Sequence, residues 1–446
     1  MHRSSLRCRA IDPRESAGAG GGLHSRAVNA SRRSALREVL LAVLLLGLAL
    51  AAAHLTREKR YEGRLASDEP EWIAISILHW RQFALGEAPA GAELDPPAER
   101  SDNPWKQGVQ RTTFGYMNPC LPKLVWGAVL HVAGHREASP YSFQLFYKPA
   151  PQRQRDAWLQ LVPAEGAARR TVLVLTALSA VLLFYCARTL APGLPGWLAG
   201  AAAFALWFAT PLVQSTSNYI RTDHFMLPLC LAGLLVALRT PRPGLAWGAL
   251  LGVACGLSVA SKLNGGLLCI ATAAWCALAV LRERVDLRRC AAALALAAAL
   301  TIAIFYALNP RLWSAPVEGV RDILARWDVL MTFFQDEHAP RTGVAVARTL
   351  PERLDLFARS LPKWNFALGL VSGAAALIGL ALVGYRAFQR DARAQVLLAF
   401  ALIFVAGTIL WLPLDWERFY LTATPALVLL QIAPIAMYRA RANSPR

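Results

Sequence analysis

The sequence predicts an all-α, polytopic integral membrane protein: a helical bundle of ten or eleven spans, with outer-face loops and juxtamembrane helices. Composition is the first observation. Of the 446 residues, 55% are hydrophobic and only 17% are charged, whereas about 25% are charged in soluble domains. Periodic placement is the second, because the apolar residues gather in repeated runs that approach the roughly 20 residues needed to cross a bilayer.

Ten apolar runs are the candidate spans. They cover residues 39–55, 170–189, 196–213, 224–239, 245–261, 265–281, 290–308, 366–385, 395–413 and 418–438. Arginine-rich links at 239–242, 282–289 and 386–393, together with both tails, are assigned to the cytoplasm by the positive-inside rule. This orientation makes residues 121–134 a juxtamembrane or re-entrant helix. The alternative is that residues 121–134 cross the membrane and that one of the ten runs does not.

The predicted domain organisation has three parts. Residues 1–36 form a basic cytoplasmic tail that we expect to be disordered, because it is polar and lacks an apolar period. Residues 37–438 form the membrane domain, and residues 439–446 form a second cytoplasmic tail. Two long outer loops, 56–169 and 309–365, are expected to pack together over the membrane face as a lid.

Charge and cysteine content exclude other classes. The net charge of +18 could suggest nucleic acid as a partner, but no soluble basic domain or groove-reading motif is visible. Much of the excess lies in the predicted cytoplasmic ends: residues 1–38 alone hold eight arginines and three acidic residues. The eight cysteines show no metal-ligand spacing, and the six that lie in apolar runs are interpreted as packing residues.

The first candidate site residues are Asp68 and Glu69, which stand in the first polar loop after a membrane span. An acidic residue near a low-dielectric boundary is a functional-site hypothesis, and a carboxylate can act as a general base. The alternative is an ordinary solvated pair. A further group, residues 336–338 (Asp-Glu-His), could resemble metal ligands, but we interpret it as solvent-exposed and assign no metal site. Whether the reaction uses a divalent cation as a cofactor is left open.

Basic residues at the outer ends of spans form the second group. Lys262 lies in a short turn and suits a phosphate as a compact point charge, and Arg170 opens a span from the outside, against the positive-inside trend. Arg221 and Asp223 lie where a loop enters a span. They either neutralise one another as a structural pair or shape a site. His224 is interpreted as an interfacial residue.

These residues fall in motifs that resemble the GT-C superfamily of membrane glycosyltransferases, and within it the dolichyl-phosphate-mannose protein mannosyltransferase and aminoarabinose transferase branch. The motifs are Asp68-Glu69, residues 118–123 (Asn-Pro-Cys-Leu-Pro-Lys), residues 219–223 (Tyr-Ile-Arg-Thr-Asp), residues 256–262 and residues 418–421 followed by Pro425. Residues 118–123 look like the family's His-Pro-Pro-Leu-Gly-Lys motif. They depart from it at Asn118, Cys120 and Pro122, which puts the branch and the acceptor in doubt more than the superfamily.

The resemblance implies transfer of a sugar from a polyprenyl-phosphate carrier to an acceptor on the extracytoplasmic face, with inversion of the anomeric centre. It implies that Asp68, with Glu69 beside it, is catalytic. Lys262 and Arg170 would hold the carrier phosphate. The residues expected to shape the site are Arg221, Asp223, Asn118, Lys123, Arg418 and Tyr420.

Partners and rivals follow from this reading. The expected partners are a polyprenyl-phosphate-linked sugar, membrane lipids and an acceptor protein, lipid or cell-wall polymer, with no nucleic acid. The Ala-, Arg- and Leu-rich composition favours a bacterial inner membrane. The main rival is a transporter or lipid flippase, which predicts inverted repeats and ionisable residues at mid-membrane depth. A non-catalytic membrane assembly protein is the second rival.

Overall fold

The computed structural model describes residues 20–57, 69–87, 119–137, 151–241, 243–283, 286–313, 315–333, 335–336 and 339–437. Among these residues every regular element is a helix, apart from one isolated antiparallel bridge between Val346 and Leu414. The chain separates into two units, residues 1–48 and 49–446, with the boundary inside the first helix. The predicted all-α membrane bundle is confirmed.

The first unit is represented by the start of α1 (Gly20–Thr56). This helix begins inside the segment 1–36, for which we expected disorder. The difference has a local cause. Residues 23–56 contain no proline and a single glycine, Gly47, and they are rich in alanine, leucine and arginine, which are strong helix formers. Helical propensity therefore extends the first apolar run toward the N-terminus.

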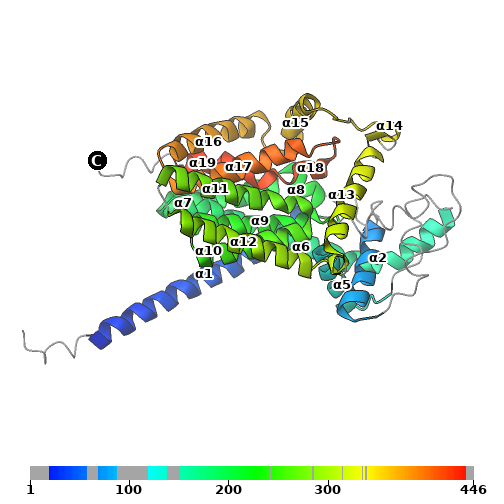
Figure 1. The fold of residues 1–446 in the computed structure, drawn as a ribbon, viewed down its shortest axis with the longest axis horizontal. Helices are drawn as coiled ribbons and strands as arrows, with labels where there is room; N and C mark the ends of the chain where they lie inside the picture. Colours follow the sequence, from blue (N-terminus) through cyan, green and yellow to red (C-terminus); the bar gives the residue numbers. More distant parts are fainter. Residues whose placement is uncertain are drawn as a thin grey trace, which may run out of the picture. The chain divides into compact units, whose positions relative to one another are not determined.

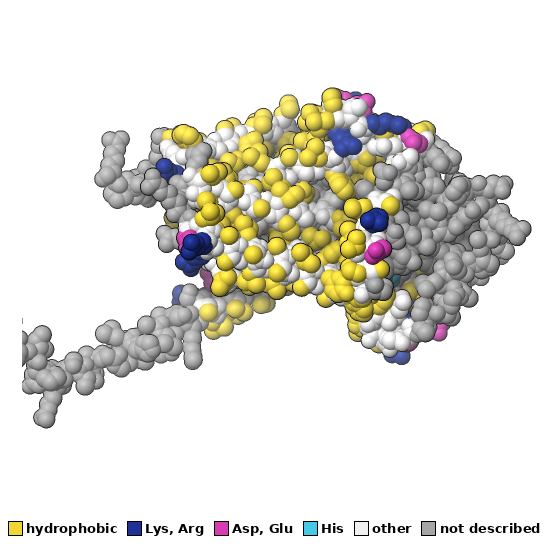
Figure 2. Space-filling model, viewed as in Figure 1, with side chains coloured by type: hydrophobic (Ala, Val, Ile, Leu, Met, Phe, Trp, Pro, Cys, Tyr) yellow, Lys and Arg dark blue, Asp and Glu magenta, His cyan; other side chains and the backbone are white. Residues whose placement is uncertain are grey.

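The second unit is a bundle of long helices that lie side by side (Figure 1). The long helices are α6 (Pro151–Thr189), α7 (Gly193–Ala209), α9 (Asp223–Arg239), α10 (Leu245–Ser261), α11 (Gly266–Glu283), α12 (Leu287–Ala307), α16 (Leu370–Phe388), α17 (Ala392–Leu410) and α19 (Thr424–Met437). Among the pairs that pack together are α10 with α12, α16 with α19, α6 with α7, and α9 with both α6 and α10. Hydrophobic side chains cover the face of this bundle shown in Figure 2, with most charged side chains toward its ends.

Each of the ten predicted spans contains a helix in the described part of the chain, although the helices break at Thr210 within 196–213 and after Tyr420 within 418–438, and the number of spans stays a prediction. In the described part of the chain, six helical segments, one of them the end of α1, are long and apolar enough to cross a membrane. Four others, α7, α9, α10 and α19, have 14 to 17 residues. A helix of 17 residues extends about 26 Å at 1.5 Å per residue, slightly less than a hydrocarbon core of about 30 Å.

Close helix packing depends on small residues at the contacts. In α16, a Cβ atom added at Gly379 would lie 1.8 Å from the carbonyl oxygen of Leu430 in α19. Only glycine therefore permits this approach of the two backbones. By contrast, Gly384 on the same helix has nothing within 4 Å of such an atom.

Shorter elements occupy the polar segments. They are α2 (Glu69–His79), η2 (Trp80–Ala84), α5 (Leu121–Val132), α8 (Pro211–Thr216), η5 (Leu263–Gly265), η6 (Pro310–Leu312), α13 (Pro316–Phe333), α14 (Ala339–Thr342), α15 (Leu350–Asn365) and α18 (Glu417–Tyr420). Figure 1 shows α2, α5, α13 and α14 together at one end of the bundle. These elements occupy the two segments that we expected to be long outer loops.

Among the described residues, contacts between the two long loop segments include one hydrogen bond and one ring pair. The backbone N–H of Cys120 donates to the side-chain oxygen of Asn309 at 3.2 Å, and the rings of Phe83 and Trp313 lie 6.4 Å apart. Helix α5, which covers most of residues 121–134, packs against α2. A common role for these segments as a lid remains a prediction, as does the juxtamembrane position of α5.

Candidate functional site

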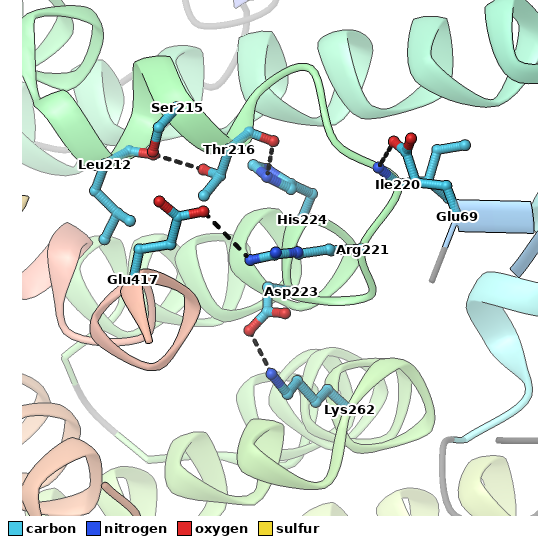
Figure 3. A network of polar contacts seen from close by, with 10 residues as sticks. All are labelled: Glu69, Leu212, Ser215, Thr216, Ile220, Arg221, Asp223, His224, Lys262 and Glu417. Atoms are coloured by element: carbon cyan, nitrogen blue, oxygen red, sulfur yellow. Dashed lines mark hydrogen bonds and ion pairs between the residues drawn. The ribbon is translucent and has the colours of Figure 1, made fainter. Parts of the chain in front are cut away.

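Lys262 and Asp223 form an ion pair at one end of the bundle (Figure 3). Asp223 is the first residue of α9, where the helix dipole favours a negative charge, and only 2% of it is exposed. Lys262 follows α10 with an extended backbone, which ends the helix and turns the side chain toward α9. The predicted tight turn between two helices is thus confirmed, with η5 immediately after Lys262.

The electrostatic surroundings favour the charged form of the acidic partner, Asp223. Burial opposes ionisation of Asp223, but the ammonium group of Lys262 and the nearby guanidinium groups of Arg418 and Arg221 lower the pKa of that carboxyl below its usual value. Burial also lowers the pKa of Lys262, although Asp223 partly offsets this effect. Asp223 therefore remains an anion at neutral pH and serves as a counter-ion for its cationic neighbours.

Arg221 is held by an aromatic ring and a second carboxylate. Its guanidinium carbon lies 3.8 Å from the ring centre of Tyr219, and its Nη1 lies 3.7 Å from Oε1 of Glu417. The sequence left open a mutual pair of Arg221 with Asp223. The structure instead directs the ion pairs to other elements, since Asp223 meets Lys262 and Arg221 faces Glu417 (Figure 3).

Arg418 adds a third cation from α18. Its guanidinium carbon lies 4.3 Å from the ring centre of Trp416, and its charge acts on Asp223. We call Arg221, Asp223, Lys262, Glu417 and Arg418 the cation cluster. It contains three basic and two acidic side chains, contributed by the turn before α9, the end of α10 and α18.

A second buried ionic group lies beside the cation cluster. Arg169 of α6 donates from Nε and Nη2 to the two carboxylate oxygens of Glu69, at 3.2 and 2.5 Å. It also pairs with Glu165, one helical turn earlier in α6. Glu69 in turn accepts the backbone N–H of Ile220 at 3.0 Å (Figure 3). We call Glu69, Glu165 and Arg169 the arginine clamp.

The turn between α8 and α9 has a further anchor in His224. Its Nε2 lies 2.9 Å from the carbonyl oxygen of Thr216, and its Nδ1 lies 3.2 Å from the hydroxyl of Thr176. The side chain is buried within the protein, and its depth at the membrane interface stays a prediction. It closes the turn that presents Arg221 and Asp223.

The other predicted site residues do not belong to the cation cluster or the arginine clamp. Asp68 and Asn118 lie outside the described residues. Lys123 is fully buried in α5, whereas Arg170 is exposed on α6. The hydroxyl of Tyr420 donates to Asp415 at 3.0 Å, and its ring stacks on Phe357.

Sequence reasoning missed the roles of Arg169 and Glu165. The spacing of Glu165 and Arg169, four residues apart, was the one available signal, but it lay in the segment 56–169 that we assigned to an outer loop. No group of three or more His, Cys, Asp or Glu residues in the described part of the chain could hold a metal ion.

Comparison with solved structures identifies the fold. The structure resembles the crystal structure of an oligosaccharyltransferase from Archaeoglobus fulgidus, which was tethered with an acceptor peptide, with a TM-score of 0.51 and 13% sequence identity. The chain shares the helical fold of that archaeal protein. The match covers 90% of this chain and 51% of the archaeal protein, so this chain spans about half the length of that protein. No protein-family model and no curated protein sequence matches the chain.

The shared fold agrees with the helical architecture and with integration in a membrane. At 13% identity, the likeness concerns the arrangement of helices alone. The chemistry of the site therefore has to be argued from the cation cluster and the arginine clamp.

Proposed function

We propose that the protein is a GT-C-type glycosyltransferase that moves a sugar from a polyprenyl-phosphate carrier to an acceptor at the extracytoplasmic face of the membrane. The observation that carries the proposal is the cation cluster, which gathers Arg221, Lys262 and Arg418 around Asp223 at one end of an apolar helical bundle. We infer that a lipid-borne anion reaches this position from within the bilayer plane.

The cluster suits a phosphate leaving group. Negative charge grows on the carrier phosphate as the glycosidic bond breaks, and cations fixed before the reaction stabilise that charge without reorganisation. Lys262 supplies a compact ammonium group, and Arg221 and Arg418 supply planar guanidinium groups that can donate two hydrogen bonds to one phosphate. Asp223 and Glu417 keep these cations in place before the carrier arrives.

The residue roles are refined from those that the resemblance implies. Asp68 is the proposed general base, which takes the proton of the attacking acceptor hydroxyl. Glu69 is fully buried in the arginine clamp, so we assign it a positioning role. Lys262 holds the phosphate, and the exposed Arg170 is of secondary importance to this site.

A transfer assay in proteoliposomes tests the proposal. A panel of polyprenyl-phosphate sugars would be incubated with wild type, Asp68→Asn, Lys262→Ala and the control Arg359→Ala. Arg359 is exposed and pairs with Asp355 on its own helix, so it offers a matched loss of one positive charge. We expect Asp68→Asn and Lys262→Ala each to lose about 10²–10³ in rate, with Arg359→Ala at wild-type rate.

Two results would reject the proposal. Wild type that consumes no carrier-linked sugar would favour the transporter or flippase, which a lipid translocation assay on the same liposomes would detect. Transfer at equal rates by wild type and Lys262→Ala would remove the cation cluster from the reaction. A bacterial inner membrane as the location also remains part of the proposal, as does the identity of the acceptor.

A further inference from the structure

Arg169 is the centre of the arginine clamp, and its contacts extend in two directions. Toward α2, two guanidinium nitrogens meet both carboxylate oxygens of Glu69. Along its own helix, Nη1 meets Glu165. All three residues are at most 6% exposed. A bidentate arginine–carboxylate pair fixes orientation as well as distance, so the position of α2 relative to α6 is set here.

Glu69 connects the arginine clamp to the cation cluster through a hydrogen bond. One of its oxygens accepts the backbone N–H of Ile220 at 3.0 Å, immediately before Arg221. The turn after Ile220 leads to Asp223, which pairs with Lys262. A single carboxylate thus connects α2 and α6 with the turn that presents two members of the cluster.

We propose that Arg169 is a positioning residue for the transferase site: by holding Glu69 against the Ile220 amide, it fixes the turn that presents Arg221 and Asp223. This inference rests on the proposed function for its effect on rate. Its structural part concerns only the described contacts and can be tested without the reaction.

Glu165 provides a matched control. It contacts the same guanidinium group as Glu69 and is similarly buried, but it belongs to α6 and makes an (i, i+4) contact within that helix. Replacing Glu165 removes one ion pair of Arg169 and leaves the connection to Ile220 in place. Replacing Glu69 or Arg169 breaks that connection.

The experiment compares Arg169→Gln, Arg169→Lys, Glu69→Gln and Glu165→Gln in purified, reconstituted protein. Hydrogen–deuterium exchange reports on the Ile220 amide, and transfer kinetics report on the site. We expect Arg169→Gln and Glu69→Gln each to speed exchange over residues 217–223 by at least tenfold and to lower kcat by a similar factor. Glu165→Gln should change both by less than threefold, and Arg169→Lys should fall between, because one ammonium group cannot span both oxygens.

A double variant separates positioning from general damage. If Arg169 acts through Glu69, then Arg169→Gln combined with Glu69→Gln should be no worse in kcat than either change alone. The inference would be overturned if the loss in kcat of the double variant equalled the product of the two single losses. It would also be overturned if Glu165→Gln were as impaired as Arg169→Gln. If wild type transfers no sugar, the proposed function fails. The structural part of the inference, that Arg169 holds the Ile220 turn through Glu69, is rejected only if Arg169→Gln leaves exchange at the Ile220 amide unchanged.

Discussion

The ammonium group of Lys262 and the carboxylate of Asp223 meet across the boundary between α10 and α9, although 39 residues separate them in the chain. Each is the partner that makes burial of the other tolerable. Removing one member of a buried pair is more costly than removing both, because it leaves a charge without compensation. This relationship leads to the first prediction.

Asp223→Asn should lower the thermal stability of the protein strongly, by about 3–5 kcal/mol on the scale of broken buried pairs. Lys262→Met should have a similar effect. The double variant Asp223→Asn, Lys262→Met should be more stable than the sum of the two losses predicts. A thermal-unfolding series in one detergent measures all three, and additive losses would show that the pair is not coupled.

The same pair predicts a pH dependence of stability. Because the pKa of Asp223 is lowered in the folded protein, its contribution is present above the usual aspartate range and is lost as the pH falls through the folded pKa. The pKa of Lys262 is lowered as well, so the folded state releases that proton at a lower pH than an exposed lysine does. Below that pKa, holding the buried proton costs stability, and the cost is relieved as the pH rises.

Melting temperatures across the acidic range should therefore fall more steeply for wild type than for the Asp223→Asn, Lys262→Met double variant. Transfer activity should decline on the alkaline side at a pH below that of an ordinary lysine, since the neutral amine no longer attracts a phosphate. Parallel acid curves for the two proteins would contradict the assignment of this titration to Asp223.

Tyr420 allows its ring and its hydroxyl to be examined separately. Burial raises the pKa of the Tyr420 phenol, so the group stays protonated and donates to Asp415. Tyr420→Phe keeps the stack on Phe357 and should cost about 1 kcal/mol, the net value of one hydrogen bond. Tyr420→Ala should cost about 3–5 kcal/mol through the lost volume; equal melting temperatures for the two variants would refute this division.

Gly379 tests how the bundle is packed. Gly379→Ala places a methyl group against the backbone of Leu430, and we expect a loss of about 1–3 kcal/mol from overpacking. Gly384→Ala, on the same helix in open space, should be neutral or stabilising by about 0.5–1 kcal/mol. Thermal unfolding of both variants measures the difference, and a stable Gly379→Ala protein would show that α16 and α19 lie further apart.

The sequence predicted the helices well because apolar run length and the absence of breakers are local properties. The tight turn at Lys262 and the gathering of Lys262, Arg221 and Asp223 were within reach for the same reason, since each marks the end of an apolar run. Which ions pair was not predictable. Asp223 meets Lys262 rather than Arg221 because the tertiary packing of α9 on α10 decides the partner.

Arg169 and Arg170 illustrate the limit of sequence reasoning most directly. Adjacent residues on a helix point about 100° apart, and only the packing of α6 shows which side chain faces inward. The sequence favoured Arg170, but Arg169 is buried and Arg170 is exposed. The partner Glu69 lies 100 residues away, beyond the reach of any local pattern.

The placement of Glu417 has a consequence for how the protein is made. Glu417 and Arg418 come much later in the chain than Glu69, Asp223 and Lys262. A growing polypeptide that has already inserted α9 and α10 has Asp223 and Lys262 but lacks the partner of Arg221. The complete charge arrangement therefore arises only after α18 has been synthesised, so ribosome-stalled or truncated chains that end before α18 carry an unfinished charge arrangement.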